Sequence, residues 1–169
     1  MKLFVDTANL ADIEAALVSG AIRGVTTNPS LLAKEPKANY VEHLRKVVGL
    51  ARRHGRGISV SVEVFTDEPE AMKQQAHELW DALAYEHLAV KVHVSHAGQH
   101  NLAVIKELAA EGIAVNCTAC MTPLQAGLAA AVGARYVSLF YNRIRDGGSG
   151  DYARCEWPSF YKRRQRAQI

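Results

Sequence analysis

The sequence lacks several features that would mark a membrane or secreted protein. It has no apolar run long enough to span a membrane and no apolar signal segment behind its first residues. It contains three cysteines, an odd number without the spacing of a disulfide scaffold, which is typical of a reducing compartment. We therefore expect a cytoplasmic protein that has no membrane partner.

A strong charge of one sign is also absent, since the formal net charge is +3. The basic excess lies in residues 152–169, where the charged side chains are Arg154, Glu156, Lys162, Arg163, Arg164 and Arg166. A short basic tail is more often solvated than bound to nucleic acid, so no nucleic-acid partner is expected. We divide the chain into a domain over residues 1–151 and a basic tail over residues 152–169.

Two common motifs are missing or incomplete. Cys117 and Cys120 have the C-x-x-C spacing, but no second pair exists to complete a zinc site, so a metal site and a redox site are both disfavoured. The turn after the first predicted strand, Asp6-Thr7-Ala8-Asn9, contains no glycine. A dinucleotide site of the Rossmann type is therefore also disfavoured.

What the sequence does contain is a regular alternation of strand-like and helix-like patterns. The predicted strands are residues 3–6, 24–27, 58–65, 88–94, 113–117 and 136–140. The predicted helices are residues 10–19, 40–54, 68–83, 101–111 and 122–132, and Asn28-Pro29-Ser30 is a turn that can open a helix. This alternation predicts an α/β fold with a parallel sheet, either an open doubly wound sheet or a (β/α)8 barrel.

Lys91 interrupts an otherwise apolar, β-branched strand at residues 88–94. Burial of an amine disfavours its charged form, and a neutral lysine can attack a carbonyl group to form a Schiff base. The alternative is a structural lysine that reaches solvent at the strand end or pairs with a carboxylate.

Polar side chains near the carboxyl ends of the predicted strands favour the barrel and a catalytic lysine. The carboxyl ends of all strands in a (β/α)8 barrel meet at one mouth, where the active sites of such enzymes lie. The side chains in question are those of Asp6, Asn28, Glu63, Lys91, Asn116, Thr118, Ser138 and Arg143. Each of them alone could be a helix cap or a turn residue.

The alternation stops after Arg143. Residues 145–151 read as a flexible glycine-rich loop, and only six β/α units of the eight in a complete barrel are encoded. We therefore expect a barrel that is incomplete in this chain, whether through truncation, a frameshift or a natural short form.

Over residues 1–151 the chain resembles the small transaldolase and fructose-6-phosphate aldolase family. The motifs that carry the resemblance are Phe4-Val5-Asp6-Thr7-Ala8-Asn9, Gly24-Val25-Thr26-Thr27-Asn28-Pro29-Ser30, Val90-Lys91-Val92, Asn116-Cys117-Thr118-Ala119 and Val137-Ser138-Leu139-Phe140-Tyr141-Asn142-Arg143. The resemblance implies a TIM barrel of the class I aldolase type that uses no metal or organic cofactor, acts on sugar phosphates and forms a homo-oligomer.

The resemblance also implies a role for each site residue. Lys91 would form the Schiff base, Asp6 would be the acid/base in carbon–carbon cleavage, and Glu63 and Thr118 would flank a proton-shuttling water. The remaining implied positions contact the substrate, with Arg143 on its phosphate: Thr27, Asn28, Asn116, Ser138, Phe140 and Arg143.

Glu63 and Phe140 indicate the branch of the family. The resemblance implies that aldolases of this family have glutamine at the first position and tyrosine at the second, whereas transaldolases have the two residues found here. The resemblance therefore favours transfer over simple cleavage. A carboxylate can act as a general base where an amide cannot. Aldolase-type cleavage remains the alternative activity, and a non-catalytic incomplete barrel that acts as a binding module is the alternative class.

His93 departs from the family pattern, which usually has proline at this position. It could titrate near neutral pH or could be a turn residue, and we expect the turn residue.

Overall fold

The computed structural model describes residues 2–36, 39–55 and 57–146 of the 169-residue chain. Six parallel strands form one sheet, hydrogen-bonded in this order: β1 (Leu3–Asp6), β2 (Ile22–Thr26), β3 (Ser59–Glu63), β4 (Leu88–His93), β7 (Val115–Cys120) and β8 (Tyr136–Leu139). The order follows the chain without a reversal, which rules out the doubly wound sheet.

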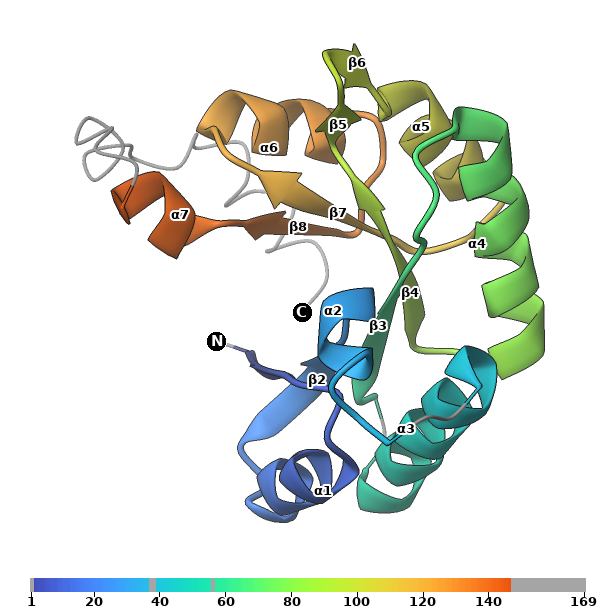
Figure 1. Ribbon diagram of the computed structural model, residues 1–169, viewed down its shortest axis with the longest axis vertical. Helices are drawn as coiled ribbons and strands as arrows, with labels where there is room; N and C mark the ends of the chain where they lie inside the picture. The colour runs from blue at the N-terminus through green and yellow to red at the C-terminus, as the bar shows by residue number, and fades with distance from the viewer. Residues whose placement is uncertain (1, 37–38, 56, 147–169) are drawn as a thin grey trace.

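Seven helices accompany this sheet in the described part of the chain. They are α1 (Leu10–Val18), α2 (Pro29–Leu32), α3 (Tyr40–His54), α4 (Pro69–Leu83), α5 (Leu102–Ala110), α6 (Pro123–Ala131) and α7 (Tyr141–Asp146). Figure 1 shows the sheet curled into an arc, with α1, α3, α4, α5 and α6 along its outside. The fold is therefore an α/β barrel of the predicted kind, but an incomplete one. The described residues supply six strands to its sheet, whereas a complete (β/α)8 barrel has eight.

The hydrophobic core lies between the outer face of the sheet and the helices. Val60 and Val62 of β3 and Val90 and Val92 of β4 are fully buried within it. Because side chains alternate along a strand, the residues between these valines point to the concave inner face. Lys91 and Ser61 are two of them, so the packing of the valines fixes the direction in which the polar residues point.

Residues 95–100 form a hairpin that the sequence analysis does not predict. Strands β5 (Ser95–His96) and β6 (Gln99–His100) pair antiparallel directly after β4, and Figure 1 shows them beyond the end of that strand. The two connecting residues, Ala97 and Gly98, both have positive φ values, 46° and 82°. A turn with two positive φ values matches the twist of a two-residue hairpin. Asparagine, aspartate or glycine usually stands at the first position of such a turn, so alanine there does not predict one.

Two other predictions need correction. His93 is the last residue of β4 and not a turn residue, because its backbone still pairs with Thr118 of β7. The predicted loop at residues 145–151 starts too early, because α7 continues to Asp146. Residues 147–151 and the predicted basic tail at residues 152–169 lie outside the described residues.

The strand predicted at residues 113–117 continues to Cys120, past an irregularity in its pairing with β8. Ala119 has a φ of 58° at this irregularity. Cys117 and Cys120 are both buried and free, with their sulfur atoms 3.7 Å apart. The hydrogen bond with Cys120 and burial raise the pKa of Cys117 well above its usual range, so this thiol stays protonated.

No helix in the described part of the chain combines the length and the apolar character that a membrane crossing requires.

Gly24 of β2 is required by the close approach of Phe4 from β1. A Cβ atom at this position would lie 2.1 Å from Cε1 of the Phe4 ring. The same ring packs edge-to-face on Tyr136 of β8, with 5.9 Å between the ring centroids. We expect Gly24→Ala to lower the free energy of unfolding by about 1–3 kcal/mol, because the ring must leave this contact. Urea unfolding followed by circular dichroism measures the change.

Gly49 in α3 provides the matched control. A Cβ atom there would meet nothing within 4 Å, so Gly49→Ala should stabilise the helix by about 0.5–1 kcal/mol. A Gly24→Ala protein as stable as the wild type would show that the Phe4 ring moves without loss.

Candidate active site

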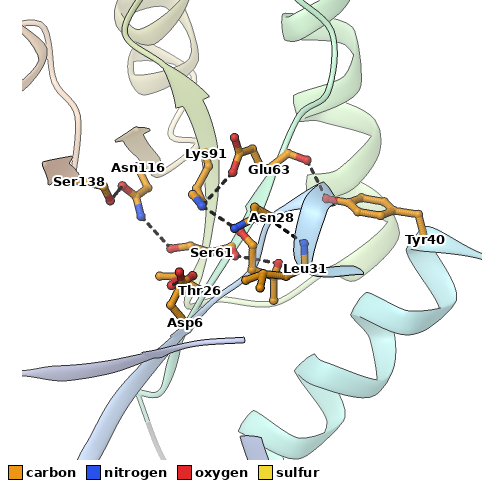
Figure 2. A network of polar contacts seen from close by, with 11 residues as sticks. Asp6, Thr26, Asn28, Leu31, Tyr40, Ser61, Glu63, Lys91, Asn116 and Ser138 are labelled. Carbon is orange, nitrogen blue, oxygen red and sulfur yellow. Dashed lines mark hydrogen bonds and ion pairs between the residues drawn. The ribbon is translucent and has the colours of Figure 1, made fainter. Parts of the chain in front are cut away.

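Lys91 lies in the middle of β4 and is 6% exposed. Its Nζ donates a hydrogen bond to the backbone oxygen of Thr27 at 2.9 Å and forms an ion pair with Oε2 of Glu63 at 2.8 Å (Figure 2). The lysine therefore does not reach solvent at the strand end. It does pair with a carboxylate, and such a pair is also what a purely structural lysine would form.

The register of three neighbouring strands brings this pair together with an amide. Glu63 of β3 is paired with Lys91 of β4, and Lys91 is paired with Asn116 of β7. Side chains at paired positions of parallel strands point to the same face, so the three lie side by side on the inner face. The predicted convergence of these three residues is confirmed.

Glu63 is anchored through its backbone as well as its side chain. The hydroxyl of Tyr40, at the start of α3, donates to the backbone oxygen of Glu63 at 2.7 Å. Burial raises the pKa of Tyr40 well above its usual range, so the phenol remains a donor at physiological pH. This bond holds the end of β3, from which the Glu63 carboxylate reaches Lys91.

Asn116 belongs to a chain of hydrogen bonds across the inner face, drawn in Figure 2. Its Nδ2 donates to the hydroxyl of Ser61 at 3.2 Å, and its Oδ1 accepts from the hydroxyl of Ser138 at 2.9 Å. The three residues come from β7, β3 and β8. Because both ends of the amide are engaged, its orientation is fixed beside Lys91.

Asp6 is the last residue of β1, and Asn28 lies two positions after the end of β2. An oxygen of the Asp6 carboxylate accepts a hydrogen bond of 2.6 Å from the hydroxyl of Thr26. Asn28 is the N-cap of α2, where its side-chain oxygen accepts from the backbone nitrogen of Leu31 at 2.9 Å. The expected helix start at Asn28-Pro29 is therefore confirmed, with Pro29 in the first turn.

Both threonines of the predicted site are buried. Thr27 donates its hydroxyl to the backbone oxygen of Ser61 at 3.3 Å, while its own backbone oxygen holds Lys91. Thr118 is 2% exposed and follows Asn116 by two positions on β7, so it shares the inner face.

Phe140 and Arg143 form a separate contact beyond β8. The guanidinium carbon of Arg143, an exposed residue of α7, lies 5.0 Å from the centroid of the Phe140 ring. Within residues 2–36, 39–55 and 57–146, no hydrogen bond or ion pair joins either residue to the Lys91 network.

Three residues of the network are not among the predicted site residues: Thr26, Tyr40 and Ser61. Ser61 precedes Glu63 by two positions on β3, so strand alternation alone could have placed it on the same face. Strand alternation places Thr26 on the inner face in the same way, and its backbone is paired with that of Ser61. Tyr40 has no such signal, because its contact with Glu63 depends on how α3 packs against β3.

The arrangement combines a buried amine, a carboxylate in contact with it and an oriented amide. A lysine in an enclosed interior can act as a nucleophile once a neighbouring base has taken its proton. Glu63 is placed for that proton transfer, since 2.8 Å between the two atoms is hydrogen-bonding distance. The site is therefore suited to covalent chemistry on a carbonyl compound.

Residues 3–165 match the family model described as Transaldolase/Fructose-6-phosphate aldolase. The chain is 38% identical over 146 residues to a "Probable transaldolase" of Kosmotoga olearia, a match that covers 86% of this chain and 62% of that protein. It is 39% identical over 149 residues to a "Probable transaldolase" of Syntrophobacter fumaroxidans, covering 86% and 63%. The chain thus spans less than two thirds of the length of these relatives.

The fold is similar to that of a solved putative fructose-1,6-biphosphate aldolase from Coccidioides immitis. The TM-score is 0.52, the sequence identity is 21%, and the match covers 79% of this chain and 52% of that one. At this identity the similarity concerns the fold alone.

Proposed function

Because the chain belongs to the transaldolase/fructose-6-phosphate aldolase family, we propose that it transfers a dihydroxyacetone unit from a ketose phosphate to an aldose phosphate. The unit is carried as a Schiff base on Lys91. The observation that supports this most is the contact of the buried Lys91 amine with the Glu63 carboxylate at 2.8 Å.

In the first step, Glu63 takes a proton from the Lys91 ammonium group. The free amine attacks the ketose carbonyl carbon, a nitrogen–carbon bond forms, and one proton of that nitrogen moves to the carbonyl oxygen, which becomes a hydroxyl. Glu63 then returns its proton to that hydroxyl, which leaves as water and completes the Schiff base. Thr118, buried on the same inner face, is proposed to hold the water that relays these protons.

In the second step, Asp6 takes the proton of the donor hydroxyl two carbons from the Schiff base carbon. The bond between the carbon that bears this hydroxyl and the carbon next to the Schiff base carbon breaks, the aldose phosphate leaves as an aldehyde, and the electron pair of that bond forms an enamine attached to Lys91. The 2.6 Å bond from Thr26 orients the Asp6 carboxylate for this transfer. Attack of the enamine on an acceptor aldehyde and reversal of the first step complete the cycle.

Asn28, Asn116 and Ser138 are proposed to bind the dihydroxyacetone unit, with Thr27 and Phe140 at its margins. The fixed amide of Asn116 and the hydroxyl of Ser138 support this, because sugar hydroxyls need donors and acceptors at set positions. A homo-oligomer remains a prediction, to which the edge positions of β1 and β8 in the described sheet lend support.

The proposal is tested by incubating the protein with fructose 6-phosphate, with and without an aldose phosphate acceptor. A transferase releases three-carbon aldose phosphate only when the acceptor is present. Release of the same product together with free dihydroxyacetone in the absence of acceptor would favour aldolase-type cleavage. No release in either case would favour the non-catalytic alternative.

Arg143 is expected to bind the phosphate of the donor. A hydrogen bond to a charged group contributes about 1.5–3 kcal/mol, so fructose 6-phosphate should bind roughly 10- to 100-fold more tightly than fructose. The Arg143→Gln substitution should remove most of that difference. Competition of the two sugars for the site, measured as inhibition constants, gives both affinities.

Arg135 is the matched control for Arg143, because its guanidinium carbon also lies over an aromatic ring, 5.9 Å from the centroid of Tyr136. Arg135→Gln should leave the preference for the phosphorylated sugar unchanged. Equal affinity of the wild type for both sugars would contradict the role of Arg143.

A further inference from the structure

Three potential metal ligands meet beside the candidate active site: Asp67, His93 and His96. Their ligand atoms all lie within 4.8 Å of one another. Oδ1 of Asp67 is 3.5 Å from Nε2 of His93 and 3.5 Å from Nδ1 of His96. Ligand atoms around a tetrahedral ion bound at about 2.0–2.1 Å are themselves roughly 3.3–3.4 Å apart. The two distances from the Asp67 oxygen are therefore close to the spacing that an ion between the three residues would impose, and the two histidine nitrogens lie within 4.8 Å of each other.

Nε2 of His93 adds an independent observation. It is buried, and it makes no hydrogen bond within the described part of the protein despite the carboxylate at 3.5 Å. Buried polar side-chain atoms nearly always have a partner, so one without any indicates a ligand that completes the site.

The backbone around the three residues holds them in place. Asn101, itself buried, donates its side-chain amide to the backbone oxygen of His93 at 3.0 Å. His96 stands on the tight hairpin of β5 and β6, whose turn residues have the positive φ values given above. Asp67 lies in the connection between β3 and α4, just before the first turn of that helix.

We propose that Asp67, His93 and His96 bind a divalent first-row transition-metal ion such as Zn²⁺. Imidazole nitrogens suit this class of ion, whereas Mg²⁺ and Ca²⁺ prefer oxygen ligands. Three protein ligands leave a coordination position open for water or for an oxygen of a bound molecule. His93 follows Lys91 by two positions on β4, so its side chain points to the same face as Lys91 and the ion would lie at the same end of the sheet.

The test is a calorimetric titration with Zn²⁺ of protein that has been stripped with a chelator. The wild type should bind one ion that Asp67→Asn, His93→Asn and His96→Asn each bind at least tenfold more weakly. The loss of an outer-shell partner alone typically lowers metal affinity about 10–100-fold. Mg²⁺ should not compete, and Co²⁺ should give visible absorption bands that the three variants lack.

His100→Asn is the matched control, because it removes an exposed imidazole from the same hairpin but outside the cluster. It should bind Zn²⁺ like the wild type. Asp67 is an exposed loop residue, and asparagine has nearly the same shape, so the Asp67→Asn protein should fold. Its Zn²⁺ affinity therefore tests the proposal even if a histidine variant fails to fold. Absence of saturable Zn²⁺ binding by the wild type, or wild-type affinity in Asp67→Asn, would overturn the proposal.

The proposed metal site and the proposed transferase activity can be tested separately. Lys91→Met cannot form a Schiff base, yet it retains the three ligands and should bind Zn²⁺ with wild-type affinity. Loss of Zn²⁺ binding in a Lys91→Met protein whose circular dichroism spectrum is that of the wild type would contradict the ligand set.

Discussion

Substitution of Lys91 by methionine is expected to lower the turnover number for dihydroxyacetone transfer by a factor on the order of 10⁴ or more. The covalent intermediate needs the amine, and methionine fills nearly the same volume without one. Loss of an acid–base group alone typically lowers a rate by about 10²–10⁴-fold, and loss of the nucleophile should exceed that. The measurement is the initial rate of acceptor-dependent release of aldose phosphate from fructose 6-phosphate.

Lys73 on α4 is the matched control for Lys91. Its Nζ also lies 2.8 Å from a glutamate, Glu107 of α5, but on the outer surface of the barrel. Lys73→Met should retain the wild-type rate. If Lys91→Met also retained it, the ion pair on the inner face would be structural and the proposed Schiff base would be wrong.

The Glu63→Gln substitution is expected to lower the rate by about 10²–10⁴-fold, the usual contribution of a general acid–base group. Glutamine has the shape of glutamate, and its side-chain oxygen can still accept a hydrogen bond from Lys91. The bond from Tyr40 reaches the backbone of residue 63, so the fold should not change. Pre-steady-state measurement of Schiff base formation should show that this step has become slow.

Glu107→Gln removes the carboxylate of the surface pair with Lys73 and serves as the control. Its rate should equal that of the wild type. A Glu63→Gln protein with unchanged Schiff base formation would remove Glu63 from the proposed mechanism, whereas the role of Lys91 would stand.

Much of the barrel follows from the sequence because local patterns agree with the tertiary contacts. The helix predicted at residues 40–54 matches α3, since apolar positions recur at helical spacing and Asn39 caps its first turn. The valine-rich strands at β3 and β4 are likewise placed correctly. Lys91, Glu63 and Asn116 could be expected to converge, because the strands of a parallel sheet end on the same edge.

The remaining features depend on contacts between distant segments or on unusual backbone. Tyr40 reaches Glu63 across 23 positions of sequence, a distance at which no local pattern acts. The hairpin after β4 and the irregularity in β7 place alanine at φ values of 46° and 58°. Glycine is the residue that normally occupies positions with positive φ, so alanine at these positions does not predict a turn or an irregular strand. The cluster of Asp67, His93 and His96 depends on that same hairpin and could not be predicted either.

Trapping of the covalent intermediate tests the proposed chemistry most directly. The protein is incubated with fructose 6-phosphate, reduced with sodium borohydride, digested and analysed by mass spectrometry. Reduction converts the carbon–nitrogen double bond of a Schiff base into a stable amine, so the sugar stays attached to its lysine. We expect an adduct on Lys91 in the wild type and none in Lys91→Met. Absence of any adduct in the wild type, or an adduct confined to another lysine, would contradict the assignment of Lys91.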